Sequence, residues 1–358
     1  MPRCKADPSI ERVENDGFKF PLGVYPVEEM TPKAGYASFF EPADGGEDAE
    51  AATEWEEWPD RYVFDIVVSA ERVEPLCRML FSLMPGRVYP IMDVLGQDAY
   101  REIDPYISYD LIGLDRFLDD VREYRDLFYE DGMVGFGAMS EDPFMYVFVD
   151  EHKIVTVRVQ PELKERVEKI LAAFDCEENP EPAGADSAAH EHRGVLLSDR
   201  SAEGMRFDEI VEVLKDEWRL LLNVDAEQNL DESGKDLGVT PWRLVIRFDP
   251  DDRSLASYVE VALAAPNLRE AEETGIDAAA RLLGDVDPDT HQPSIVGSDR
   301  LSREQLADLL KTAASKRRTR AKRPAPKVAK GDDVAIDPPP SETEPLKAGQ
   351  IWLARIVN

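Results

Sequence analysis

The sequence predicts an α+β fold, on three observations. Apolar and polar residues alternate in short runs between 61 and 159, which is typical of strands. Between these runs, apolar residues recur every three or four positions, as over 114–128, which is typical of amphipathic helices. A stretch rich in Pro, Ala and acidic residues at 177–194 separates this region from a second one of the same kind. We therefore expect two α+β modules among the 358 residues.

The first module is expected over 61–176. A strand at 62–68 precedes a helix that carries Pro75 in its first turn and ends at Pro85-Gly86. Two strands, a second helix and a third strand follow, and this βαββαβ order predicts a ferredoxin-like sheet, extended by a hairpin and a helix. The elements expected after the first helix are strands at 87–95 and 106–112, a helix at 114–128, strands at 133–139, 144–149 and 154–159, and a helix at 163–174.

The second, smaller α+β module is expected over 195–310, with 177–194 as the linker. Its first helix covers 207–222, where the apolar residues follow helical spacing. Two alternating strands at 242–248 and 258–263 and a helix at 268–283 come next. Ser302 and Gln305 then form a capping box, which predicts the start of a last helix.

Charged segments flank the two modules. Residues 1–60 are predicted to be an acidic, partly disordered arm, because Glu41 to Asp60 hold nine carboxylates and no Lys or Arg. Residues 311–345 are predicted to be a disordered tether, basic at first, then acidic and Pro-rich. Residues 346–358 contain a strand-like run with Trp352, which either completes the chain's own sheet or docks on the edge of a partner's sheet.

The net charge of −32 argues against broad contact with a nucleic-acid backbone, which needs clustered Lys and Arg. No run approaches the roughly 18 apolar residues of a membrane span, so no membrane partner is expected. Cys4, Cys77 and Cys176 form no CxxC pair, which favours free thiols in a reducing compartment. The cytoplasm is therefore the expected location.

The basic part of the tether is the sharpest charge feature. Residues 311–330 hold nine basic residues and no acidic one, so nucleic acid, an acidic protein partner or the chain's own acidic arm can bind there. A solvated linker explains the same residues equally well. The candidate partner-binding residues are Lys316, Arg317, Arg318, Arg320, Lys322, Arg323 and, in the terminal strand, Trp352.

Two segments have spacings that can hold a metal. Asn229, Asp231 and Ser233, followed by Gly234, are spaced as in a calcium loop, but Thr240 stands where the bidentate Glu belongs. His190-Glu191-His192 offers two imidazoles, but a linker gives them no fixed geometry, so a solvated role is expected. His152 falls in a hairpin turn, where exposure without function is normal. No cofactor is expected.

No sequence motif identifies a reaction, so no catalytic residue is named. The leading interpretation is a non-catalytic intracellular interaction or regulatory protein that acts through its charged arms. One alternative is a metal-dependent hydrolase or nuclease whose carboxylates cluster only in the fold. The other is a nucleic-acid-associated protein that uses only the basic tail.

Overall fold

The computed structural model describes residues 3–43, 58–197, 205–249, 256–284, 293–320, 336–340 and 344–357. It combines helices with largely antiparallel sheets, so the predicted α+β class is confirmed. The chain divides into two compact units. The first comprises 1–95 and 103–223, and the second comprises 96–102 and 224–358. Among the described residues, no helix is both long and apolar enough to cross a membrane.

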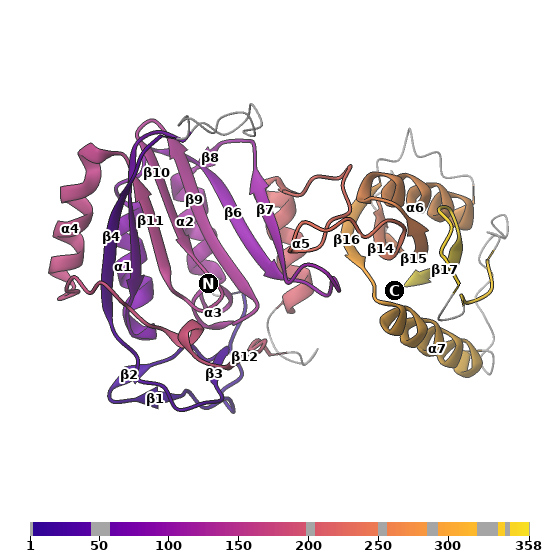
Figure 1. Cartoon of the computed structure of the whole chain (residues 1–358), viewed down its shortest axis with the longest axis horizontal. Coiled ribbons are helices and arrows are strands. Elements are labelled where there is room, and N and C mark those ends of the chain that lie inside the picture. Colours follow the sequence, from indigo (N-terminus) through magenta and orange to yellow (C-terminus); the bar gives the residue numbers. More distant parts are fainter. Residues whose placement is uncertain are drawn as a thin grey trace. The chain divides into compact units, whose positions relative to one another are not determined.

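The first unit is built on a nine-stranded sheet in the order β13-β7-β6-β9-β10-β11-β5-β4, with β8 paired to β6 (Figure 1). Neighbouring strands in it are antiparallel. Its strands are β4 (Gly35–Glu41), β5 (Arg61–Val67), β6 (Arg87–Leu95), β7 (Ile103–Ser108), β8 (Ile112–Gly113), β9 (Val134–Glu141), β10 (Phe144–Val149), β11 (Val155–Val159) and β13 (Leu220–Leu222).

The ferredoxin-like prediction is wrong in its strand order. In that arrangement the first strand of the unit lies between the third and the fourth. Here β5 pairs with β4 and β11 instead. The reason is local: β10 and β11 form a tight hairpin, and this hairpin stands in the sheet between β9 and β5.

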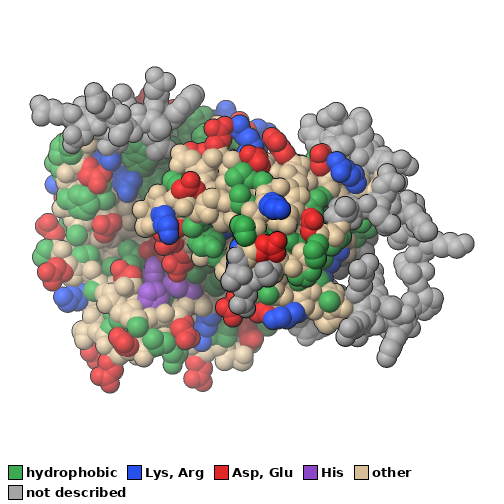
Figure 2. Space-filling view, turned by 45° about the vertical axis from the view of Figure 1, so that its right-hand side comes forward, with side chains coloured by type: hydrophobic (Ala, Val, Ile, Leu, Met, Phe, Trp, Pro, Cys, Tyr) green, Lys and Arg blue, Asp and Glu red, His purple; other side chains and the backbone are tan. Residues whose placement is uncertain are grey.

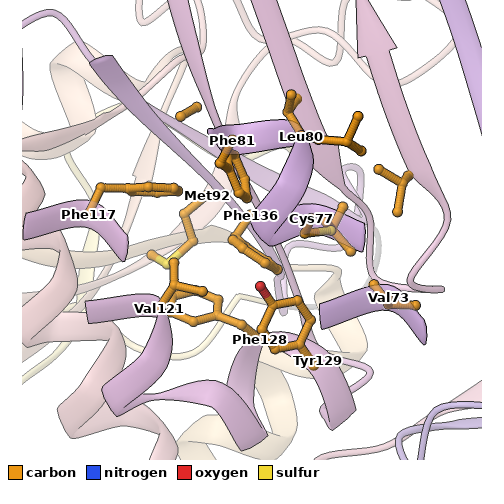
Figure 3. Close-up of a cluster of buried hydrophobic side chains, with 14 of the residues drawn as sticks. Val73, Cys77, Leu80, Phe81, Met92, Phe117, Val121, Phe128, Tyr129 and Phe136 are labelled. Atoms are coloured by element: carbon orange, nitrogen blue, oxygen red, sulfur yellow. The ribbon is translucent and has the colours of Figure 1, made fainter. Parts of the chain in front are cut away.

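Helices cover one face of this sheet and bury its main core. They are α1 (Ala70–Phe81), α2 (Leu114–Glu123), α3 (Arg125–Glu130), α4 (Lys164–Ala173) and α5 (Phe207–Trp218). Figure 3 shows the centre of this core, where Phe81, Phe117 and Phe128 from the helices meet Met92 and Phe136 from the strands. Every one of these five side chains is fully buried.

The domain boundary lies later in the chain than the sequence predicts. Helix α5, expected in the second module, belongs to the first unit, because Trp218 stacks on Phe128 at 5.6 Å and meets Phe117 at 5.0 Å between ring centroids. The expected linker 177–194 is also folded within this unit. Its strand β12 (His190–His192) pairs with β3 (Val24–Pro26), and Ala183 bridges to Lys33.

The expected N-terminal arm is folded over much of its length. Strands β1 (Glu14–Asn15), β2 (Phe18–Lys19), β3 and β4 all belong to it. Glu41 forms an ion pair with Arg61 at 2.7 Å across the β4–β5 pair. Most of the acidic run falls on 44–57, which lie outside the described residues, so the prediction of disorder there stays a prediction.

The second unit is a four-stranded antiparallel sheet in the order β16-β14-β15-β17. The strand at the end of the chain, β17, pairs with β15 and so completes its own unit's sheet, which was one of the two predicted outcomes. Trp352 is buried there beside Leu301 and Leu306. The elements of this unit are β14 (Thr240–Phe248), β15 (Ser257–Ala265), α6 (Leu268–Leu283), β16 (Ser294–Arg300), α7 (Arg303–Arg320) and β17 (Ile351–Val357).

Candidate metal centre

Three histidines of the first unit converge on one point, although the sequence separates them. The Nε2 atom of His190 lies 2.9 Å from Nε2 of His152 and 3.1 Å from Nε2 of His192. The three ring centroids are 4.7 to 4.9 Å apart. The side chains gather in one patch on the surface of the unit (purple in Figure 2). Their ligand atoms form a group that can hold a metal ion.

Backbone structure brings the three rings together. His190 and His192 are alternate residues of β12, so their side chains point to the same side of the strand. Pairing of His190 with Pro26 and of His192 with Val24 fixes that register. His152 lies in the turn between β10 and β11, which closes because Lys153 takes a φ of 67° and its amide donates to the carbonyl of Asp150.

The second nitrogen of each ring has an acceptor. Nδ1 of His190 donates to the carbonyl of Ala188 at 2.7 Å, and Nδ1 of His192 donates to the carbonyl of Gly132 at 2.8 Å. Nδ1 of His152 faces Asp150 Oδ2 and Glu151 Oε1, each at 3.4 Å. Acceptors of these kinds orient metal-ligating imidazoles and raise their basicity.

These partners decide where the ring protons are. A carbonyl oxygen only accepts, so His190 and His192 each carry a proton on Nδ1. Their Nε2 atoms then face each other as two lone pairs 3.1 Å apart. A proton on one of the two nitrogens, which makes an N–H···N hydrogen bond, or a metal ion between them removes the repulsion between the lone pairs. The three Nε2 atoms are therefore placed so that they could hold a cation with nitrogen ligands.

Zinc fits the geometry of the three nitrogens. Zn–N bonds of about 2.0–2.1 Å in a tetrahedron place neighbouring nitrogens about 3.3 Å apart. The observed separations of 2.9 and 3.1 Å are a few tenths of an ångström shorter, so a small outward shift of the rings accommodates the ion. Within the part of the chain that is described, the group around the Nε2 atoms contains three residues, which leaves a fourth position without a protein ligand.

The local field attracts cations. Burial by itself lowers the pKa of His152, but its hydrogen bond with Asp150 and the negative charges of Asp150, Glu151 and Asp186 outweigh that effect and raise it. The pKa of His192 is lowered to about 4, first by burial and then by the neighbouring His152. His192 is therefore neutral at pH 7, which is the form that binds a metal.

The carbonyl that holds His192 is fixed by an unusually close backbone contact. A Cβ atom on Gly132 would lie 2.1 Å from the carbonyl oxygen of Gly23, and one on Gly23 would lie 1.9 Å from the amide nitrogen of Gly132. The amide of Arg193 donates to Gly23, and the amide of Gly132 donates to Arg193. Only glycine permits the two strands of backbone to approach in this way.

Gly132→Ala is expected to weaken zinc binding about 10- to 100-fold, although every ligand stays in place. The added methyl group pushes the Gly132 carbonyl away from Gly23 and so turns the ring of His192. Isothermal titration with Zn²⁺ measures the effect. Gly194→Ala is the matched control, because a Cβ there has its nearest neighbour at 3.8 Å. Equal affinities for the two variants would show that the carbonyl does not position the ring.

A further carboxyl near the turn has a strongly shifted pKa. The pKa of Asp93, on β6, is raised from 3.8 to about 7, first by burial and then by the charges of Glu151 and Asp150. The folded chain thus keeps a proton on Asp93 between pH 3.8 and about 7, where the unfolded chain has released it. Stability contributed by this proton is present at low pH and lost as the pH rises through that window.

Asp93→Asn is consequently expected to stabilise the first unit at pH 8 by about 2–4 kcal/mol, because Asn carries no charge to bury. Below pH 4 the difference from the wild type is expected to vanish. Urea unfolding at pH 4, 6 and 8 measures it. Glu165→Gln, at a carboxylate that is 83% exposed, is expected to show no such trend. A stability difference for Asp93→Asn that does not change with pH would contradict the expectation.

The calcium-loop prediction gains no support from the structure, because several of the loop's oxygens already accept hydrogen bonds within the protein. Oδ1 of Asn229 accepts from Arg300 at 3.3 Å, and its amide donates to Gly238 and Thr240. Oδ1 of Asp231 accepts from the backbone and hydroxyl of Ser233 and from the amide of Lys235. The guanidinium of Arg300 thus already supplies a positive charge beside Asn229.

Most of the predicted partner-binding residues lie where the structure does not describe their side chains. Four of them, Lys316, Arg317, Arg318 and Arg320, fall in the last turns of α7, and their side chains lie outside what the structure describes. The same holds for the whole of Lys322 and Arg323. Trp352 is buried in its own unit. Contact of the basic tail with a partner therefore stays a prediction from sequence.

The segment His190-Glu191-His192, expected to lie in a linker without fixed geometry, is instead a paired strand with partly exposed histidines, and a metal-binding role for it stays a proposal. The expectation of a linker rested on the composition of the segment, whereas backbone pairing with β3 gives the two rings a fixed geometry. The third histidine of the group, His152, precedes His190 by 38 positions, so no local spacing connects them. The usable signal was the alternate spacing of two histidines in a chain that has only four.

Comparison with known proteins adds no relative: no family model, no curated protein and no solved structure matches the chain. The three-histidine site is thus assigned from its geometry alone.

Proposed function

We propose that the chain is a metal-dependent protein whose first unit binds one divalent ion of the zinc class through Nε2 of His152, His190 and His192. The observation that carries the proposal is the convergence of the three Nε2 atoms, with Nδ1 of His190 and of His192 each held by a backbone carbonyl on the other side of its ring. Three imidazoles favour zinc and its neighbours over magnesium and calcium, which prefer oxygen ligands.

This proposal keeps the metal dependence of one alternative predicted from the sequence, a metal-dependent hydrolase or nuclease, but changes its ligands. Its carboxylates were expected to be the ligands, whereas here Asp150 and Glu151 face Nδ1 of His152, on the far side of the ring from Nε2. They support a ligand and add negative charge beside the site. An interaction role through the charged arms is compatible with this function, but it rests on sequence alone.

Titration of the metal-free full chain with Zn²⁺, Co²⁺, Mg²⁺ and Ca²⁺ tests the proposal. One Zn²⁺ or Co²⁺ per chain is expected to bind, with Mg²⁺ and Ca²⁺ giving no saturable heat. The Co²⁺ complex is expected to show the intense visible absorption of four-coordinate nitrogen ligation. Stoichiometric zinc binding that persists after His152→Ala together with His192→Ala would overturn the proposal.

A further inference from the structure

Two buried charged side chains, Asp131 and Lys153, hold the backbone segments that carry the histidines. Asp131 is 0% exposed and Lys153 is 2% exposed. A charge is unfavourable to bury unless hydrogen bonds or an opposite charge compensate it. The hydrogen bonds of these two groups therefore show which parts of the chain depend on them.

The carboxylate of Asp131 joins two segments beside His192. Its Oδ1 accepts the amide of Met133 at 2.9 Å, and its Oδ2 accepts the amide of Val195 at 2.7 Å. Gly132 lies between Asp131 and Met133, and its carbonyl is the acceptor for Nδ1 of His192. Val195 follows His192 on the same segment of the chain. One carboxylate thus fixes both the acceptor of this ring and the segment that carries the ring.

The ammonium group of Lys153 joins the turn of His152 to the same region. Lys153 directly follows His152 in the chain, and its Nζ donates to the carbonyl of Val134 at 2.5 Å. Val134 is the first residue of β9 and lies two positions after Gly132. A buried side chain that reaches from the turn to the start of β9 limits how far His152 can move away from His192.

The spacing of the three rings is short for a metal site. Nε2 of His190 lies 2.9 and 3.1 Å from the other two Nε2 atoms. A zinc tetrahedron needs about 3.3 Å, so zinc requires only a small outward shift. Cd²⁺ has the same charge as Zn²⁺ but is larger, and its longer bonds to nitrogen need a wider spacing. A site whose backbone resists spreading therefore favours Zn²⁺ over Cd²⁺, because cavity size and flexibility set metal selectivity.

We propose that, given the proposed metal function, Asp131 and Lys153 determine which ion the site accepts. They keep the three imidazoles close together, so that Zn²⁺ fits and the larger Cd²⁺ is disfavoured. Both act through the backbone that carries the ligands and are positioning residues, not ligands. Groups that orient metal ligands in this way typically change metal affinity by about 10- to 100-fold.

Competition of the full chain with a chromophoric chelator, for Zn²⁺ and for Cd²⁺, tests the proposal in the variant Asp131→Asn. The side chain of Asn accepts through one oxygen only, so one of the two amides loses its acceptor. The affinity for Zn²⁺ is expected to fall about 10- to 100-fold. The affinity for Cd²⁺ is expected to change by less than about threefold, because looser support lets the rings spread to the longer bonds.

Lys153→Met is the second variant, since it removes the ammonium group and keeps an apolar side chain in the buried position. It is expected to lower the ratio of Zn²⁺ to Cd²⁺ affinity in the same direction, and it carries the test if Asp131→Asn does not fold. Ile210→Ala is the control, because Ile210 is fully buried in the core of the same unit. A loss of folded protein weakens the binding of both ions equally, so its ratio is expected to stay within about twofold of the wild type.

The outcomes separate the inference from the function on which it rests. A wild-type chain that binds no Zn²⁺ overturns the proposed function, and the inference falls with it. Zinc binding by the wild type, with the same ratio of affinities in Asp131→Asn and Lys153→Met, overturns the inference alone, even where both affinities fall together. A ratio that falls in these two variants and not in Ile210→Ala supports the inference.

Discussion

Replacing Asp98 by Asn is expected to destabilise the second unit by about 3–5 kcal/mol, because it leaves a buried guanidinium without its counter-charge. The side chain of Asp98 is completely buried, and its carboxylate accepts hydrogen bonds from the backbone amide of Arg300 at 2.8 Å and from Nε of Arg300 at 3.0 Å. The same guanidinium donates to the carbonyl of Leu230, and its side chain is only 5% exposed. The pair thus joins 96–102 to the rest of the unit.

Unfolding in guanidinium chloride, together with hydrogen exchange of β14 to β17, measures this loss of stability. Asp277→Asn is the matched control in the same unit, since its contact with Arg281 is 4.0 Å long and both side chains are more than two-thirds exposed. That change is expected to cost no more than about 0.5 kcal/mol. A cost below about 1 kcal/mol for Asp98→Asn would show that the pair does not hold the unit together.

The double variant Asp98→Asn with Arg300→Met sharpens the interpretation. Removing both charges of a buried pair costs less than removing one, because no uncompensated charge is left. We therefore expect the double variant to be more stable than Asp98→Asn alone. If it is less stable, then the hydrogen bonds of Arg300 with Asn229 and Leu230, and not the charge pair, dominate.

Individual helices and strands could be predicted from the sequence more fully than the way they pack together. A helix was predicted over 207–222 from apolar spacing, which is a property of the helix itself, and the structure has it over 207–218, with Leu220–Leu222 forming β13 instead. The surface that this helix packs against is not evident from the sequence, because Trp218 stacks on Phe128, ninety residues earlier. Any apolar surface would have satisfied the same spacing. The domain boundary was misplaced for this reason.

The strand order was mispredicted for a related reason. Alternation identifies β5 and β11 as strands, but their pairing is set by backbone hydrogen bonds that any residues can form. The order of helices and strands along the chain matches the ferredoxin-like arrangement, but the order of the strands in the sheet does not. The hairpin β10–β11 takes the place beside β5.

The candidate site shows most clearly that pairing between distant segments is not visible in the sequence pattern. Composition predicted a linker at 177–194, since Pro, Ala and acidic residues cannot build a hydrophobic core. The segment is nonetheless ordered, by pairing of β12 with β3 and of Ala183 with Lys33. Backbone pairing leaves no mark in hydropathy. A pair of alternating histidines in such a segment is a sign to look for a third.

Zinc is expected to stabilise the first unit through its three ligands, and His190→Ala is expected to abolish that stabilisation. At a free concentration 100 times the dissociation constant, binding to the folded state alone adds about 2.7 kcal/mol. The ion would tie β12 to the β10–β11 turn, two segments that otherwise meet at the histidine rings. Hydrogen exchange is therefore expected to slow at 150–154, 190–193 and 24–26.

The metal-free state of the same variant is informative because its expected change in stability is small, unlike the loss expected when zinc is present. Removing the His190 ring also removes the nitrogen that faces Nε2 of His192. The metal-free His190→Ala variant is therefore expected to lose little stability relative to the metal-free wild type. Glu191→Gln keeps all three ligands and is expected to retain the zinc effect. If zinc stabilises His190→Ala as much as the wild type, the ion binds elsewhere. The reason is that His190 is the ring whose Nε2 faces both other rings, so the site cannot hold the ion as before without it.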